Sequence, residues 1–189
     1  MRRAAWSPTR RAFLFCRRAV AGVEFAIIAP ALIVMLCASF DAANAEAIYV
    51  KLRAATSALS TMTIHSTTLQ TSDVAELLGV AGLILAPYSS APLNETISQI
   101  AIDASGNATV QWSAGAAPLS VGSAISLPAA FDTPNSYTIF VQGNYLFTPM
   151  FSFFAPGGIT LTDTLYATPS ALQCINFPSQ GVTGCNALQ

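Results

Sequence analysis

The uncharged run from Phe25 to Phe40 constrains this chain more than any other feature. It holds sixteen residues without a carboxylate, an ammonium or a guanidinium group, and eight of them are Phe, Ile, Leu or Val. Each of these eight side chains favours the bilayer by roughly 0.3 to 0.6 kcal/mol, so together they contribute about 2 to 5 kcal/mol. A spanning helix uses about 20 residues, so residues 20–45 are predicted to form one transmembrane helix. Pro30 lies inside it and should bend it locally, which membrane helices tolerate.

Charge is divided sharply across this run and predicts its orientation. Six arginines precede residue 19, where no acidic residue occurs, whereas from Asp41 onward only Lys51 and Arg53 stand against eight carboxylates. Cationic flanks of membrane helices stay in the cytoplasm. The acidic remainder of the chain is therefore expected to be exported.

The four cysteines fall on different sides of the predicted membrane. Cys16 lies in the basic segment and Cys37 in the membrane run, which leaves Cys174 and Cys185 in the exported part. An oxidising compartment would join these two and close a short loop, which would stabilise the fold by about 2 to 3 kcal/mol. Two free thiols are the alternative.

The junction between the basic segment and the apolar run carries a family resemblance. It reads Arg17-Arg18-Ala19-Val20-Ala21-Gly22-Val23-Glu24-Phe25-Ala26, followed by an apolar stretch containing a proline. This resembles the start of TadE-like pseudopilins of the tight-adherence (Tad, or Flp) pilus. The resemblance implies cleavage between Ala19 and Val20, although Ala19 stands where the family usually has glycine.

The same resemblance gives Glu24 and Phe25 a role in assembly. In pilins the corresponding glutamate pairs with the new N-terminal amine of a neighbouring subunit, which here would be the amine of Val20. A carboxylate at the edge of a bilayer is costly, which suggests a function. The alternative is that Glu24 only reaches the lipid headgroups or contacts Arg18.

The family also implies an architecture, a location and partners. Residues 1–19 would be a prepilin-like leader, and the fold would be α+β and pilin-like, with a long membrane-spanning helix, a short helix and a small antiparallel sheet. The chain would be a minor pseudopilin of a Tad-type, type IVb-like pilus. It would lie in the bacterial inner membrane with a cytoplasmic N-terminus and a periplasmic C-terminal part. Its expected partners are a prepilin peptidase, other pilin or pseudopilin subunits, the Tad secretion machinery and inner-membrane lipid.

Three other interpretations compete with this one. Residues 9–14 resemble a twin-arginine export motif, but Arg17 and Arg18 interrupt the apolar stretch that should follow. Residues 43–45 form an A-x-A site where a signal peptidase could cut after Ala45 and release a soluble protein. The third alternative is a permanently anchored periplasmic binding module.

Residues 46–92 are predicted to be a periplasmic helical segment. An apolar stripe with helical spacing continues past the membrane; it consists of Ile48, Leu52, Ala55, Leu59, Met62 and Leu69. The opposite face carries Glu46, Lys51, Arg53, Ser57 and Ser60. A second helix is expected from Ser72 or Asp73 to Leu85, with Asp73 and Glu76 at capping-box spacing and Pro87 beyond its end.

Residues 93–189 are predicted to form a periplasmic β-rich domain. Alternating or β-branched stretches predict strands at 95–102, 108–113, 136–146 and 159–167. The first two should form a hairpin, because the turn between them, residues 103–107, contains Gly and Asn. The aromatic run from Phe147 to Phe154 would either pack inside or offer a contact surface.

We expect no enzymatic activity from this composition. The exported part has His65 as its only histidine, scattered carboxylates, and no pattern that pairs a nucleophile with a base. No metal site or cofactor is expected, because His65 has no second histidine and no cysteine near it in sequence. The acidic balance argues against a nucleic-acid ligand.

Overall fold

The computed structural model describes residues 17–151, 155–170 and 174–183, with the side chains described from residue 21 onward. The chain divides into two compact units, Met1–Ala43 and Asn44–Gln189, and each is treated by itself. The elements are α2 (Arg17–Ile64), α3 (Thr71–Ile84), β1 (Leu93–Ile102), β2 (Ala108–Gly115), β3 (Ser136–Phe147), β4 (Ile159–Ala167) and η1 (Pro178–Gln180).

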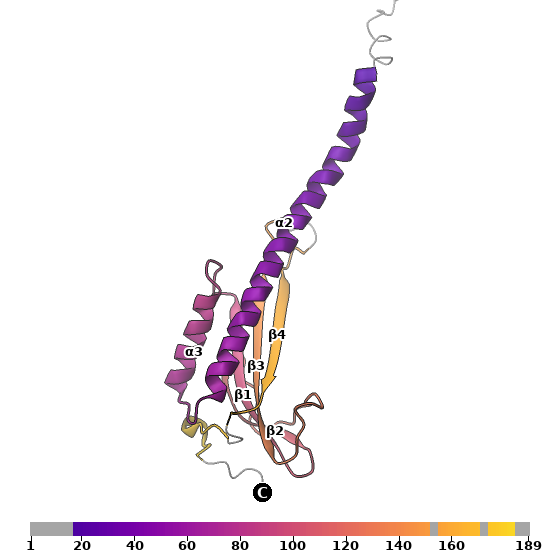
Figure 1. Cartoon of the computed structure of the whole chain (residues 1–189). Coiled ribbons are helices and arrows are strands. Elements are labelled where there is room, and N and C mark those ends of the chain that lie inside the picture. Colours follow the sequence, from indigo (N-terminus) through magenta and orange to yellow (C-terminus); the bar gives the residue numbers. More distant parts are fainter. Residues whose placement is uncertain (1–16, 152–154, 171–173, 184–189) are drawn as a thin grey trace, which may run out of the picture. The chain divides into compact units, whose positions relative to one another are not determined.

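The predicted α+β class is confirmed. A long N-terminal helix is followed by a short helix and four antiparallel strands (Figure 1). The helix α2 begins at Arg17, three residues before the predicted start, and continues without a break past Pro30 to Ile64. All four predicted strands are present, and β4 has the bounds expected from its Thr- and Leu-rich sequence.

The strands form one sheet in the order β2-β1-β3-β4. Strands β1 and β3 are central, and all eight residues of β1 from Glu95 to Ile102 are buried. A central strand covered on both faces gives no clean alternation of apolar and polar residues, and the sequence of β1 alternates only imperfectly. The β1–β2 register shifts between Gln99 and Ile100, so a bulge separates the two halves of this pair.

The hairpin between β1 and β2 is confirmed. Gly106 has φ of 82°, a conformation that glycine adopts without strain. The carboxylate of Asp103 accepts hydrogen bonds of 2.8 Å from the backbone N–H groups of Ser105 and Asn107 and from the Asn107 side chain. The side-chain bond from Asn107, followed by its backbone bond, holds the pKa of Asp103 below its usual value.

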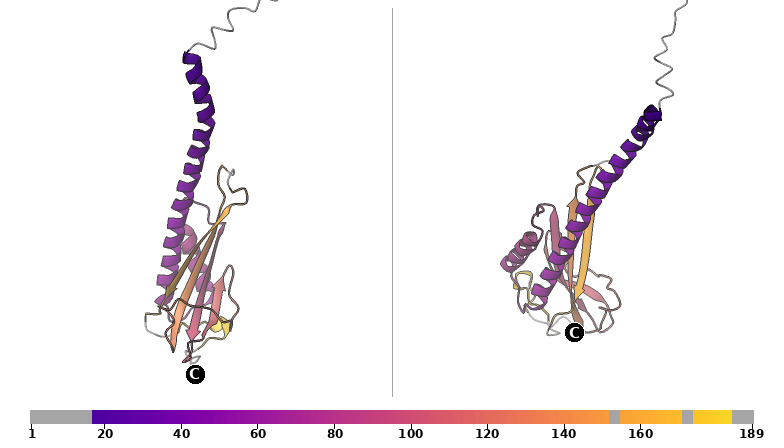
Figure 2. Two further views of the ribbon diagram at one scale, coloured as in Figure 1. Left: turned by 90° about the vertical axis from the view of Figure 1, so that its right-hand side faces the viewer. Right: turned by 45° about the horizontal axis from the view of Figure 1, so that its top comes forward.

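The C-terminal part of α2 packs against one face of the sheet (Figure 2). Four residues of the predicted stripe, Ile48, Leu52, Ala55 and Leu59, are buried there with Ile97, Ile139 and Val141 of the sheet. Gly143 of β3 allows this close approach. A Cβ at that position would lie 2.8 Å from Thr56 Oγ1 and 2.9 Å from Leu52 Cδ1.

Two details predicted for α2 are wrong. Met62 is 42% exposed, and Ser60, expected on the solvent face, is buried. The physical reason is that small polar side chains share the packed face: Thr56 and Thr63 are buried as well. They shift the centre of that face away from Met62. Thr56 satisfies its hydroxyl by donating to the Leu52 carbonyl one turn earlier, so it can be buried at little cost.

Helix α3 lies beside the C-terminal part of α2 in the views of Figures 1 and 2. Asp73 and Glu76 were predicted to cap the start of this helix, but the capping pair is Gln70 and Asp73, about one turn earlier. The helix begins at Thr71, and Asp73 Oδ2 accepts a hydrogen bond of 2.8 Å from the backbone N–H of Gln70, the N-cap residue. At the other end, Lys51 Nζ donates to the carbonyls of Ile84 (3.3 Å) and Ala86 (2.6 Å). A cation at a helix C-terminus is stabilising.

A C-terminal segment, residues 174–183, is joined to the sheet by hydrogen bonds. Trp112 Nε1 donates to the Ile175 carbonyl (3.0 Å), and Gln99 Oε1 accepts from the Ile175 N–H (2.6 Å). The indole of Trp112 also stacks on Phe177, with ring centroids 5.0 Å apart. This segment therefore completes the hydrophobic core from the end of the chain.

The opposite face of the sheet has its own small cluster. Ile100, Ile102, Ala108 and Phe140 are packed there with Leu119, Ile125 and Leu127 from the connection between β2 and β3. The apolar residues of that connection therefore cover this face.

Candidate functional site

The N-terminal part of α2 presents apolar side chains around its whole circumference. Large apolar residues are exposed from Val23 to Phe40, including the consecutive Ile33, Val34, Met35 and Leu36. Four consecutive helical residues point in four directions, about 100° apart, so no face of the helix here is polar. From Ala21, α2 is long and apolar enough to span a membrane. A helix that is apolar on all sides must be covered by lipid or by other protein.

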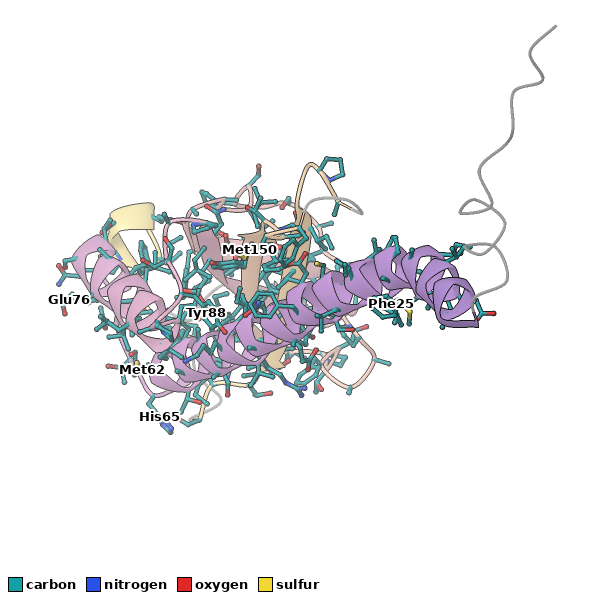
Figure 3. All side chains as sticks on the ribbon, turned by 90° about the horizontal axis from the view of Figure 1, so that it is seen from above. Phe25, Met62, His65, Glu76, Tyr88 and Met150 are labelled. Atoms are coloured by element: carbon teal, nitrogen blue, oxygen red, sulfur yellow. The ribbon has the colours of Figure 1, made fainter. Side chains whose placement is uncertain are left out.

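The predicted processing and assembly residues all lie on this part of α2. Ala19 and Val20 are within the helix, and Glu24 follows Val20 by four residues, which is about one turn. Glu24 is exposed and the Phe25 side chain is 69% exposed (Figure 3). The structure therefore places Glu24 on the surface of the helix at the start of the apolar stretch. Cleavage between Ala19 and Val20 stays a prediction.

The alternative A-x-A site also lies in α2. Ala43 and Ala45 fall in the middle of the helix, which continues for nineteen more residues to Ile64. Release after Ala45 would therefore require cleavage within helical backbone.

The predicted disulfide falls partly outside the described residues. Cys174 is buried and disulfide-bonded, whereas Cys185 lies outside the described ranges. Its pairing with Cys174 therefore stays a prediction. Cys37, in α2, is a free cysteine.

The aromatic run divides between core and surface. Phe147 is buried and belongs to the core under α2, while Leu146, Met150 and Ile159 are 47%, 76% and 48% exposed around the β3–β4 connection. Residues 152–154 of the run lie outside the described residues. The first aromatic ring is thus a packing residue, and an exposed apolar group adjoins it.

His65 is exposed and directly follows the last residue of α2 (Figure 3). Within the described ranges, no three His, Cys, Asp or Glu side chains are grouped so that they could hold a metal ion.

Sequence reasoning missed Glu95. It was predicted to begin a strand, where a carboxylate is usually at the surface, but it is 3% exposed. Neither carboxyl oxygen has a hydrogen-bond partner in the described part of the chain. Burial raises the pKa of Glu95 to about 7. The residues that cover a β-strand come from distant parts of the chain, so no local sequence signal could reveal that Glu95 is buried.

Comparison of the chain with protein-family models, with curated proteins and with solved structures finds no match.

Proposed function

We propose that this chain is a minor pseudopilin, an assembly subunit of a Tad-type, type IVb-like pilus. A prepilin peptidase would cut it between Ala19 and Val20, and α2 would anchor it in the bacterial inner membrane. The unit Asn44–Gln189 would then lie in the periplasm or project from the fibre. The basic leader would stay in the cytoplasm, as the positive-inside rule requires.

The observation that carries this proposal is the combination on α2 of an all-round apolar surface with one acid at its start. Ten large apolar residues between Val23 and Phe40 are exposed. Burying each of them fully would contribute about 1.5 to 3 kcal/mol, which favours both insertion and packing beside similar helices. Glu24 is the only charged residue between Val20 and Phe40. In a low-dielectric surrounding it needs a partner, and the amine of Val20 on a neighbouring subunit would supply one.

The assembly role is tested by replacing Glu24 in the native host. Glu24→Gln keeps the side-chain shape and removes the charge, so fibres recovered by shearing from the cell surface should fall at least about tenfold, equivalent to 1.4 kcal/mol. Glu46→Gln is the matched control, because Glu46 is an exposed glutamate of the same helix beyond the apolar stretch. Both variants must be inserted in membranes to the same level as the wild type. Wild-type fibre yield with Glu24→Gln would contradict the proposal.

A second candidate function is that of a permanently anchored periplasmic binding module. It is favoured by Glu95, a residue that lines a cavity in the unit Asn44–Gln189 and whose buried carboxyl group has no hydrogen-bond partner among the described residues. In that case the chain would keep its leader and α2 would serve only as an anchor.

A further inference from the structure

A cavity of about 300 Å³ lies between α3, the start of β1 and the residue that follows β2. Its walls are mostly apolar and include Leu78 and Leu83 of α3, Leu93 of β1, and Ala116. Leu83 and Ser90 are exposed, so the cavity is reached from solvent. Among the described residues that line it, Glu95 is the only ionisable one.

Glu95 is held at this cavity by its backbone. It pairs with Gly143 of β3 on one side, and its carbonyl accepts a hydrogen bond of 2.9 Å from the Ala116 N–H on the other. Gly115 lies so close that a Cβ there would approach the Glu95 carbonyl oxygen to 2.2 Å. Pairing on both sides fixes the backbone of Glu95 at the edge of the cavity, whereas its side chain can still turn about its own torsions.

An unsatisfied buried carboxyl group normally costs about 1 to 3 kcal/mol, and more if it is charged. Both carboxyl oxygens lie behind the cavity wall, so a ligand must draw the Glu95 side chain into the cavity by a change of rotamer. A ligand suited to do this brings hydrogen-bond donors, a positive charge and an apolar portion. A bound divalent metal ion needs several oxygen ligands, and the lining offers only one carboxylate. A primary ammonium group has three donors on a compact charge, enough for both Glu95 oxygens and the Ser90 hydroxyl.

We propose that this cavity binds a small organic amine, through an ion pair between the ammonium group of the ligand and the carboxylate of Glu95. The apolar portion of the amine would contact Leu78, Leu83 and Leu93. This inference does not depend on whether the chain enters a fibre.

The site should bind its ligand more tightly as the pH rises from 5 to 8. The cavity-lining residues of α3, Leu78, Gly79, Gly82 and Leu83, are uncharged, as are Gly143 of β3 and the residues Leu52 and Thr56 packed over it. The neighbouring cation is Lys51 of α2, whose Nζ donates to the Ile84 and Ala86 carbonyls at the end of α3, and burial is the cause of the raised pKa of Glu95. Ionisation of Glu95 alone therefore sets the dependence. With its pKa at about 7, the ionised fraction rises on the order of 90-fold over this interval, while an alkylamine stays protonated.

The test uses the full chain in detergent micelles, with n-butylammonium as the ligand and 1-butanol as its neutral counterpart. Binding measured by calorimetry at pH 8 should be lost at pH 5 and absent for 1-butanol. Glu95→Gln should weaken it at least tenfold, whereas Glu76→Gln, on the exposed side of α3 (Figure 3), should leave it unchanged. Equal affinity of the Glu95→Gln and wild-type chains, or no binding by the wild type, would overturn the proposal.

A second variant blocks the cavity without touching Glu95. Gly82 lines it beside Ser90, and a Cβ there would lie 3.3 Å from the Ser90 Cβ, so Gly82→Leu places bulk against the cavity wall, where the exposed Ser90 can give way, and also favours the helix. It should abolish binding while the chain stays folded, and unchanged binding would contradict the location of the site. A lysine-containing hexapeptide tests whether the ammonium group belongs to a small free amine or to a peptide. If the peptide binds far more tightly than n-butylammonium, the cavity is an ammonium site but its ligand is not a small free amine.

Discussion

Glu95 should make the unit Asn44–Gln189 less stable as the pH rises. Its pKa is 4.5 in the unfolded chain and about 7 in the folded one, because burial disfavours the charged form. Well below pH 4.5 the group is protonated in both states, so its ionisation contributes nothing to the free energy of unfolding. Between pH 4.5 and 7 the unfolded chain ionises while the folded chain holds its proton, so the free energy of unfolding decreases with pH. Above pH 7 the loss is complete.

The size of this loss follows from the difference between the two pKa values. At 1.36 kcal/mol for each unit of difference, the loss is at most about 3 kcal/mol, and water reaching the open cavity reduces it. Between pH 5 and 8 the free energy of unfolding of the wild type should therefore fall by most of this amount. Glu95→Gln removes the ionisation and should abolish this decrease. The unsatisfied amide that it introduces carries a constant cost at every pH, so it does not affect the comparison of slopes.

The assay is urea unfolding in one detergent at pH 5 and at pH 8, followed by the fluorescence of the buried Trp112. Trp6, the second tryptophan of the chain, is replaced by Phe in both proteins. Asp103 does not interfere, because its lowered pKa affects stability only at more acidic pH. If the wild type and Glu95→Gln lose the same free energy between the two pH values, Glu95 is not the cause and the reasoning fails.

Three further substitutions test the packing of the same unit. Gly143→Val would drive side-chain atoms into Leu52 at the contact of α2 with the sheet and should cost about 1 to 3 kcal/mol in urea unfolding; wild-type stability would contradict the close approach. Trp112→Phe leaves the buried Ile175 carbonyl without its donor, and the resulting loss of about 1 to 3 kcal/mol should appear as a lower thermal midpoint by circular dichroism. Lys51→Met removes the two hydrogen bonds at the C-terminus of α3 and should cost about 1 kcal/mol, with faster amide exchange confined to the end of that helix.

The elements of the fold could be predicted because their signals are local. The apolar run and the stripe through Leu52 and Leu59 follow helical spacing, and the hairpin at residues 103–107 depends on a glycine with positive φ. The errors arose where contacts with residues distant in the chain decide whether a side chain is buried. Ser60 was predicted on the solvent face of α2, yet it is buried, as Leu52 and Leu59 are.

The C-terminal segment and the cavity could not have been predicted for the same reason. Ile175 is held by Gln99 and Trp112, more than sixty residues earlier, and nothing in residues 174–183 alternates like a strand. The burial of Glu95 results from strands on both of its sides and from α3 above. By contrast, the candidate processing site at Ala19 and Val20 is a contiguous stretch of sequence, so it could be proposed from residues alone.

The intact mass of the chain extracted from membranes of its native host tests the central claim most directly. We predict a protein that begins at Val20, and a full-length protein that begins at Met1 in cells lacking the prepilin peptidase. A chain that keeps Met1 even when the peptidase is present would indicate a permanent anchor and contradict the proposed function. A start at Glu46 would instead indicate release by signal peptidase, and would contradict it equally.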